Sequence, residues 1–308
     1  MSRYRYLFGP VPSRRLGRSL GVDLVPFKTC TLDCLFCEVG ATTCSTLARK
    51  EYVPTDEVIA ELSDWFREGG GADYITLAGS GEPTLHVNFG RILEFVSDNA
   101  SAATAILSNG TLLSLPEVRE DACRASLVKV SLSAWDQASY ERLHRPCTGV
   151  SLDAMVESYV KFRDQFQGKL WIEVFLLKGV NADDSQVARI ARLVDRIGPD
   201  RVHLNTAVRP PADPLAVAVS PRRLLELSAL FSPPAEVVAS FRGKEARDIE
   251  PPRTEILAML KRRPCTAEQI SAAFGIARPR VNETVRHLLE DNEIEETPSD
   301  GETYLSAT

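Results

Sequence analysis

Apolar and polar residues follow two different periodicities along the first 240 or so positions. Short runs rich in β-branched residues are typical of buried strands, and they occur at 20–25, 73–78, 104–108, 127–132, 171–177 and 201–206. Stretches with apolar residues at helical spacing lie between them and predict helices at 55–68, 88–99, 116–124, 137–144, 152–166, 184–197 and 221–231. Strand–helix repeats of this kind predict an α/β fold with a parallel sheet. We expect a partial (β/α)6 barrel of the TIM type, with its chemistry at the carboxyl ends of the strands.

The pattern changes after about residue 243. The polar, proline-bearing segment 243–252 is typical of a linker. Helical patterns then follow at 254–262, 266–273 and 278–290, with a turn at Gly275 and a hairpin-like segment that turns near Ser299, Asp300 and Gly301. This order predicts a winged helix-turn-helix. We therefore expect a larger domain over 1–242, a linker over 243–252 and a small domain over 253–308.

Charge and hydropathy exclude some function classes. The 308 residues carry a net charge of −6, which argues against a protein that coats nucleic acid. Residues 1–50 nevertheless hold eight basic and only three acidic groups, so an anionic group is expected near that segment. The chain has no run of 18 apolar residues, and its first residues do not form the apolar core of a signal peptide. We expect a cytoplasmic protein with no membrane partner.

Three of the seven cysteines share one short segment, CTLDCLFC, directly after the first predicted strand. Cys30, Cys34 and Cys37 follow the spacing C-x3-C-x2-C, and three thiolates on one loop can hold three corners of an iron–sulfur cluster while one iron stays open. Zinc held by the same cysteines with Cys44 as fourth ligand is the alternative. Cys44, Cys123 and Cys147 show no ligand spacing of their own, so buried or incidental thiols are expected there.

Two further motifs stand at the ends of the next strands. Gly79-Ser80-Gly81-Glu82-Pro83 follows the second predicted strand, and Ser108-Asn109-Gly110-Thr111 follows the third. With the cysteine spacing, and with Phe36 before the third cysteine, this order resembles the radical S-adenosylmethionine (SAM) superfamily. Ser80 departs mildly from the family's glycine-rich GGEP pattern, where main-chain groups meet the amino group of SAM.

The resemblance implies a function. Residues 1–242 would form the catalytic domain, and Cys30, Cys34 and Cys37 would ligate a [4Fe-4S] cluster whose open iron binds SAM. One electron, delivered by a small flavodoxin- or ferredoxin-type donor, would cleave SAM and start radical chemistry on a substrate. The residues implied to bind SAM are Phe36, Gly79, Ser80, Gly81, Glu82 and Asn109, with Ser131 and Ser133 on the fourth strand as neighbours.

Longer phrases such as FGPVPSRRLGRSLGVDLVPFKTC and SLSAWDQASYERLHRPCTGVS resemble uncharacterised radical SAM proteins grouped with tRNA wyosine-base synthases. This chain has no cysteine trio before Cys30 for a second cluster, so we do not carry that reaction over. The sequence identifies no catalytic residue and no substrate. A wyosine-like tRNA-base modification enzyme stays an alternative, and a cluster- or zinc-sensing DNA-binding regulator is another.

Basic residues supply the remaining candidates. Lys28, Arg14, Arg15 and Arg209 are candidate substrate groups, because arginine makes bidentate contacts with carboxylate and phosphate. His144 ends a predicted helix, where a cation also merely satisfies the helix dipole. Arg278, Arg280 and Arg286 on the last predicted helix could contact nucleic acid, but residues 253–308 hold seven basic against ten acidic groups. A contact with a protein or with the barrel is the competing role for this domain.

Overall fold

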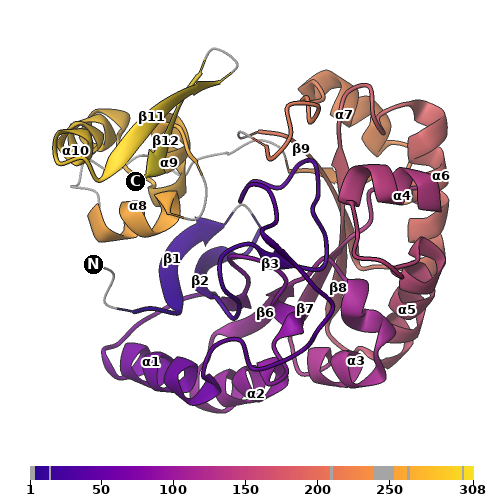
Figure 1. Ribbon diagram of the computed structural model, residues 1–308, viewed down its shortest axis with the longest axis horizontal. Helices are drawn as coiled ribbons and strands as arrows, with labels where there is room; N and C mark the ends of the chain where they lie inside the picture. Colours follow the sequence, from indigo (N-terminus) through magenta and orange to yellow (C-terminus); the bar gives the residue numbers. More distant parts are fainter. Residues whose placement is uncertain (1–3, 14, 209–210, 239–252, 262–263, 300–301) are drawn as a thin grey trace.

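The larger unit is built on one sheet (Figure 1). The computed structural model describes residues 4–13, 15–208, 211–238, 253–261, 264–299 and 302–308. Within these residues the sheet has the order β1-β2-β5-β6-β7-β8-β9-β10. Its strands are β1 (Leu7–Ser13), β2 (Gly17–Val22), β5 (Tyr74–Leu77), β6 (Ala103–Leu107), β7 (Leu127–Ser131), β8 (Lys169–Leu176), β9 (Arg201–Thr206) and β10 (Glu236–Val237).

The strands from β2 to β10 run parallel to their neighbours, and the edge strand β1 pairs antiparallel with β2. The six predicted strands are confirmed, and the parallel α/β barrel type with them. Strands β1 and β10 were not predicted. The very short β3 (Thr29–Cys30) and β4 (Cys44–Ser45) pair with each other beside the cysteine segment.

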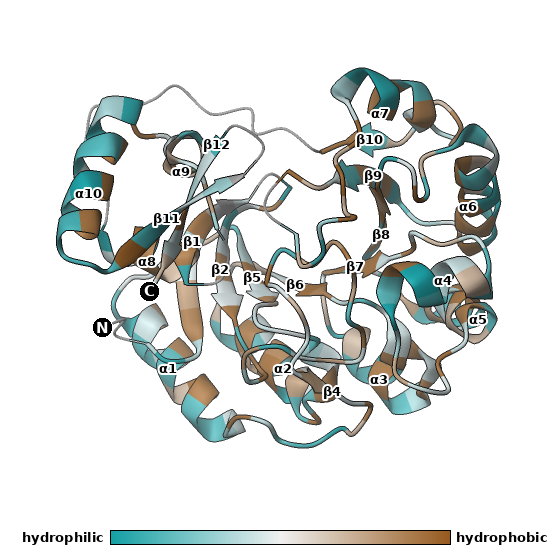
Figure 2. Cartoon of the chain, turned by 45° about the horizontal axis from the view of Figure 1, so that its top comes forward, coloured by the Kyte–Doolittle hydropathy of each residue, from teal (hydrophilic) through white to brown (hydrophobic). Residues whose placement is uncertain are grey.

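The predicted helices cover the outside of the sheet (Figure 1). They are α1 (Thr55–Arg67), α2 (Phe89–Asn99), α3 (Pro116–Ala122), α4 (Gln137–His144), α5 (Leu152–Gln165), α6 (Asp184–Ile197) and α7 (Pro221–Ser228). In α6 the residues Val187, Ile190 and Val194 recur at helical spacing and are buried, and Gly198 ends the helix in the left-handed conformation. Figure 2 shows the same division, with hydrophilic residues on the outer faces of the helices.

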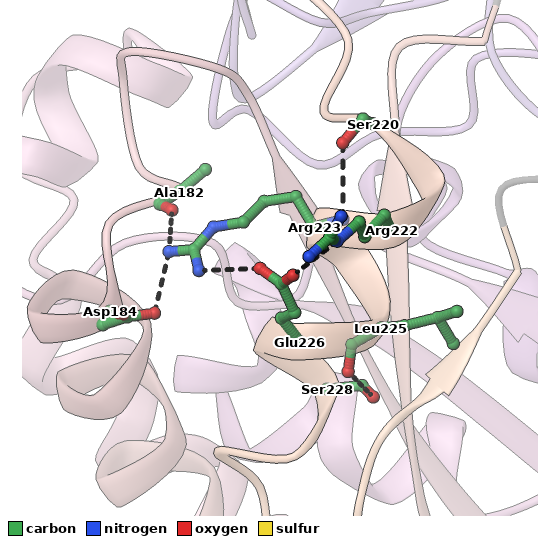
Figure 3. A network of polar contacts seen from close by, with 8 residues as sticks. All are labelled: Ala182, Asp184, Ser220, Arg222, Arg223, Leu225, Glu226 and Ser228. Atoms are coloured by element: carbon green, nitrogen blue, oxygen red, sulfur yellow. Dashed lines mark hydrogen bonds and ion pairs between the residues drawn. The ribbon is translucent and has the colours of Figure 1, made fainter.

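Helix α7 is tied to α6 by polar contacts that Figure 3 draws from close by. The Arg223 guanidinium donates to the Ala182 carbonyl oxygen at 3.2 Å and to the Asp184 carboxylate at 2.7 Å. Glu226, one helical turn further, accepts from Arg222 and Arg223. These contacts join the last helix of the barrel to the helix before it.

Residues on β8 alternate between two environments. Leu170, Ile172 and Val174 are buried in the main core under the helices. Trp171 faces the other way, into a separate small apolar cluster with Leu16, Ala105 and Leu127. The inner face of the curved sheet therefore has its own floor, built from β6, β7, β8 and the turn after β1.

The C-terminal unit has its own core and the element order of a winged helix-turn-helix, as predicted. It comprises α8 (Arg253–Leu260), α9 (Ala267–Phe274), α10 (Arg278–Glu290), β11 (Ile294–Ser299) and β12 (Glu302–Ala307). Helices α8 and α9 pack against β1, and Gln269 and Tyr304 both donate to the Val208 carbonyl oxygen. The linker predicted at 243–252 lies outside the described residues. Among the described helices, none has both the length and the hydropathy to cross a membrane.

Candidate functional site

The cysteine segment crosses the carboxyl ends of the parallel strands and is fastened to both sides of the barrel. At its start, Lys28 N donates to the Ser80 carbonyl oxygen at 2.8 Å, and Glu82 N donates to the Thr29 carbonyl oxygen at 3.1 Å. Further along, Leu35 N donates to the Leu143 carbonyl oxygen at the end of α4. Main-chain hydrogen bonds thus hold the segment between the loop after β5 and the C-terminus of α4.

Each of the three clustered thiols lies next to one polar side chain. One of these side chains belongs to the start of the cysteine segment, and the other two come from distant parts of the chain. Lys28 Nζ donates to Cys37 Sγ at 3.1 Å, and Asn109 Nδ2 donates to Cys30 Sγ at 3.5 Å. His144 Nδ1 lies 3.2 Å from Cys34 Sγ. The structure therefore brings residues from three segments to the three sulfurs.

The chemistry of this donor set suits a metal cluster. Burial raises the pKa of the Cys30 thiol to about 12, and the pKa of Cys34 is also raised, by burial first and then by Cys30 and Cys37. A metal that binds there displaces the thiol protons. Among the described residues no three His, Cys, Asp or Glu side chains lie close enough together to hold one metal ion.

Aromatic rings line one side of the cysteine segment. The Phe36 ring stacks on the Phe175 ring at 4.2 Å between centroids, and it meets the His144 ring edge to face at 5.4 Å. Phe175 stands near the carboxyl end of β8 on its inner face. Burial lowers the pKa of His144 to about 4, so this side chain is neutral near pH 7 and is not a solvated cation at the end of α4.

The loop after β5 lies so close to the cysteine segment and to Asp23 that two of its positions require glycine. A Cβ on Gly81 would lie 1.8 Å from the Thr29 carbonyl oxygen, and Gly79 has φ +151° with the Asp23 carboxylate 2.5 Å from its Cβ position. Ser80 N and Oγ donate to that Asp23 carboxylate at 3.0 and 2.5 Å. The serine at the usual glycine position therefore anchors the loop to the end of β2.

Glu82 connects this loop with the loop after β6. Its fully buried carboxylate accepts hydrogen bonds from Thr84, from Ser108 Oγ at 2.7 Å and from Asn109 N at 2.7 Å. Burial raises the pKa of Glu82, whereas these hydrogen bonds lower it. Asn109 is held in turn, since its Nδ2 also donates to Thr31 Oγ1 at 2.7 Å.

The two serines of the fourth strand region lie in different surroundings. The Ser131 carbonyl oxygen accepts from the buried Tyr159 hydroxyl at 3.1 Å, and the same hydroxyl donates to the Asn109 carbonyl oxygen at 3.0 Å. Ser133 is fully buried, and its Oγ accepts from Phe175 N at 2.9 Å. Both serines therefore help to position the residues that surround the site.

The remaining candidates are not all brought to the site. Lys28 is buried beside Cys37, whereas Arg15 reaches Glu173 on the inner face of β8. Arg14 and Arg209 lie outside the described residues. Cys44 is exposed, while Cys147 packs beside the cysteine segment, with Cys147 N bonded to the Thr31 carbonyl oxygen and its thiol 3.0 Å from Ser45 Oγ.

Sequence reasoning missed Asp23, Thr31 and Tyr159 as supports of the site. Asp23 could have been found, because a carboxylate inside the apolar run LGVDLV requires a partner when it is buried. The contact between His144 and Cys34 joins positions 110 residues apart, and no local pattern indicates it.

Two family models match the chain. Residues 24–194 match the radical SAM superfamily, and residues 247–302 match the MarR family. The first match contains all the motifs described above, from the cysteine segment to the end of β8.

Whole proteins and solved structures are also similar. A UPF0026 protein of Methanocaldococcus jannaschii is 29% identical over 90% of this chain and 90% of that protein. A protein of Brachyspira hyodysenteriae named GTPase Obg is 33% identical over 94% of this chain, which spans only 43% of that protein's length. The structure of TYW1 with a lysine–pyruvate adduct bound superposes with a TM-score of 0.55 and 16% identity, over 74% of this chain and 76% of that one.

Proposed function

Because the chain belongs to the radical SAM superfamily, we propose that it is an enzyme that binds a [4Fe-4S] cluster through Cys30, Cys34 and Cys37. The cluster, together with SAM, supplies one-electron cleavage of the SAM sulfonium, which starts radical chemistry on a substrate. The proposal assigns the catalytic domain to residues 1–242 and the winged helix to 253–308.

The observation that carries the proposal is the set of partners around the three thiols. Three soft sulfur ligands on one segment suit iron–sulfur chemistry. Lys28 Nζ places a cation beside Cys37, which offsets the negative charge of ligating thiolates. Asn109 supplies a further N–H to Cys30, and hydrogen bonds to cluster sulfurs set the reduction potential.

The loops after β5 and β6 would hold SAM. Gly79, Ser80 and Gly81 bring main-chain polar groups next to the cysteine segment, since Gly81 touches Thr29 and Lys28 N bonds to Ser80. Glu82 acts as a positioning residue, because its carboxylate spans the two loops and fixes Ser108 and Asn109. Phe36 gives the site an apolar wall through its stack on Phe175.

The winged helix favours a contact with the barrel over nucleic acid as its main role. Arg278, Arg280 and Arg286 on α10 each pair with an acidic residue of the same domain, namely Glu268, Glu283 and Glu290. Nucleic acid that binds at α10 has to compete with these carboxylates for the arginines, and the carboxylates repel its phosphates. The packing of α8 and α9 on β1 is the contact that supports the competing role.

The wyosine-like reaction and the DNA-binding regulator stay second candidates. The likeness to TYW1 shows the fold, and two buried lysines near the site already have partners, since Lys28 Nζ donates to Cys37 and Lys129 Nζ donates to Glu173. For the regulator, the paired arginines of α10 leave little free positive charge. A flavodoxin- or ferredoxin-type electron donor and a cytoplasmic location belong to the proposal.

Anaerobic reconstitution with iron and sulfide tests the proposal. We expect about four irons per chain, a brown chromophore, and 5′-deoxyadenosine after reduction in the presence of SAM. Cys34→Ala should lose the colour and the product together, whereas Cys123→Ala, which changes a partly buried thiol at the C-terminal end of α3, should keep both. Tightly bound zinc with no SAM cleavage would overturn the proposal.

A further inference from the structure

His144 is a buried side chain that the proposed function leaves without a role. It is the last residue of α4, and only 2% of its surface is exposed. A polar ring that is buried to this degree needs a hydrogen-bond partner inside the protein. The structure gives its Nδ1 a sulfur, Cys34 Sγ, at 3.2 Å. The ring therefore faces the middle thiol of the cysteine segment rather than solvent at the helix end.

The end of α4 and the cysteine segment are joined on both sides of Cys34. Asp33 N donates to the His144 carbonyl oxygen at 2.9 Å, and Leu35 N donates to the Leu143 carbonyl oxygen at 3.0 Å. The last carbonyl groups of a helix have no partner within the helix, so these two bonds use acceptors that α4 leaves free. Main-chain hydrogen bonds therefore flank the contact between Cys34 Sγ and the imidazole and fix the two residues relative to each other.

Neighbouring side chains hold the ring of His144 and the end of α4 in place. The Phe36 ring meets the imidazole edge to face at 5.4 Å between centroids, and the Tyr140 ring, one helical turn earlier, lies 5.0 Å away. Directly after the helix, Arg145 has the left-handed conformation with φ +42°. Its guanidinium pairs with Asp213 at 2.6 Å, which ties the end of α4 to the loop after β9. The imidazole is thus held on several sides.

The contact between His144 and Cys34 has a defined direction once Cys34 ligates a metal. A ligating cysteine is a thiolate, which has no hydrogen to donate. A ring nitrogen can bond to a thiolate only when it carries a hydrogen, so the hydrogen of this contact lies on Nδ1. His144 then donates to its sulfur, as the side chains next to Cys30 and Cys37 donate to theirs.

We infer that His144 is a positioning residue for the cluster, whose Nδ1–H bonds to the sulfur of Cys34 and raises the reduction potential of the cluster. A reduced cluster carries one more electron than an oxidised one, so a donor at one of its sulfurs stabilises the reduced state more strongly. Burial increases this effect, because little water is present to screen it. The role of His144 rests on the cluster of the proposed function, but it does not rest on SAM cleavage.

Packing is the competing role, because the imidazole also contacts the rings of Phe36 and Tyr140. Two variants separate the roles. His144→Phe keeps a ring but removes the donor. His144→Asn removes the ring but keeps an N–H at the place of Nδ1, since asparagine Nδ2 and histidine Nδ1 are both bonded to Cγ. His287→Phe, at an exposed histidine of α10, is the matched control.

A redox titration of each reconstituted full-length chain tests the role of His144, with the EPR signal of the reduced cluster as the readout. At a fixed solution potential, we expect the ratio of reduced to oxidised cluster in His144→Phe to fall at least about threefold. This corresponds to a midpoint potential about 28 mV lower, at about 59 mV for each factor of ten in a one-electron couple. His144→Asn and His287→Phe should stay within about twofold of the unmodified chain.

An unchanged midpoint potential in His144→Phe would overturn the role of His144 as a donor, and so would an equal shift in His144→Asn and His144→Phe. Iron content is measured before each titration, because a variant can fail to assemble a cluster. If His144→Phe holds no cluster, His144→Asn decides. A cluster with the unmodified potential in His144→Asn supports the donor, whereas no cluster or a lower potential overturns it.

The unmodified chain, measured alongside, separates this inference from the proposed function. If it assembles no cluster, both are refuted. If it assembles a cluster but cleaves no SAM, and His144→Phe has the lower potential, the proposed SAM chemistry is refuted and the role of His144 stands. If it cleaves SAM and His144→Phe has the same potential, the role of His144 alone is refuted.

Discussion

Gly81 is the position where the cysteine segment and the loop after β5 touch most closely, so Gly81→Ala is a direct test of the site's construction. The added Cβ would stand 1.8 Å from the Thr29 carbonyl oxygen and 3.1 Å from Val25 Cγ2. An ordinary carbon–oxygen contact needs about 3.3 Å, so the two backbones must separate by about 1.5 Å. Thr29 directly precedes Cys30, and the movement is therefore transmitted to the first candidate ligand.

The loss of stability can be estimated from the hydrogen bonds that this separation breaks. The hydrogen bonds from Glu82 N to the Thr29 carbonyl oxygen and from Lys28 N to the Ser80 carbonyl oxygen hold the two segments together. Each contributes about 1 kcal/mol net, and the forced contact itself costs about 1–3 kcal/mol. We expect Gly81→Ala to lower the free energy of unfolding by about 3–5 kcal/mol.

Urea unfolding of the reduced, cluster-free chain measures this loss, and iron content after reconstitution measures the displacement of Cys30. Gly71→Ala is the matched control, because a Cβ there meets no atom within 4 Å and the residue does not need a positive φ. It should stay within about 0.5 kcal/mol of the unmodified chain. An unfolding midpoint and an iron content for Gly81→Ala equal to those of Gly71→Ala would refute the reasoning.

Two further predictions concern buried side chains around the site. Tyr159→Phe removes the hydroxyl that donates to the carbonyl oxygens of Asn109 and Ser131, so we expect a loss of about 1–3 kcal/mol in urea unfolding and weaker SAM binding; an unchanged midpoint would contradict this. His203 has a pKa lowered to about 4 from 6.5, and the unfolded chain therefore takes up its proton first as the pH falls. Between pH 6.5 and pH 4, the free energy of unfolding of the unmodified chain should fall by up to about 3 kcal/mol more than that of His203→Gln. Below pH 4 the difference between the two chains should stay constant. If the two free energies of unfolding change in parallel with pH over this range, the assignment is wrong.

Local periodicity was enough to predict the repeating part of the fold. The six parallel strands are buried on both faces and therefore appear as short apolar runs, and helices such as α4 and α6 begin and end where the pattern predicts. The edge strand β1 was missed, because it pairs antiparallel with β2 and contains Gly9 and Pro10 at an irregularity in the register. Strand β10 has only two residues, too few for any periodicity.

In the candidate site, too, the local motifs could be predicted from the sequence, whereas the contacts between distant residues could not. The sequence by itself determined the cysteine spacing and the two loop motifs, because each is confined to a few consecutive residues that must share one loop. Only the tertiary structure placed His144 on Cys34, Lys129 on Glu173, and Arg15 inside the barrel. These partners come from strands and loops far apart in the chain, and they meet because the curved sheet closes around its inner face. From the sequence alone, a charged residue is expected to be exposed to solvent. Whether it is buried, and which residue it pairs with, depends on the segments that the tertiary structure brings next to it.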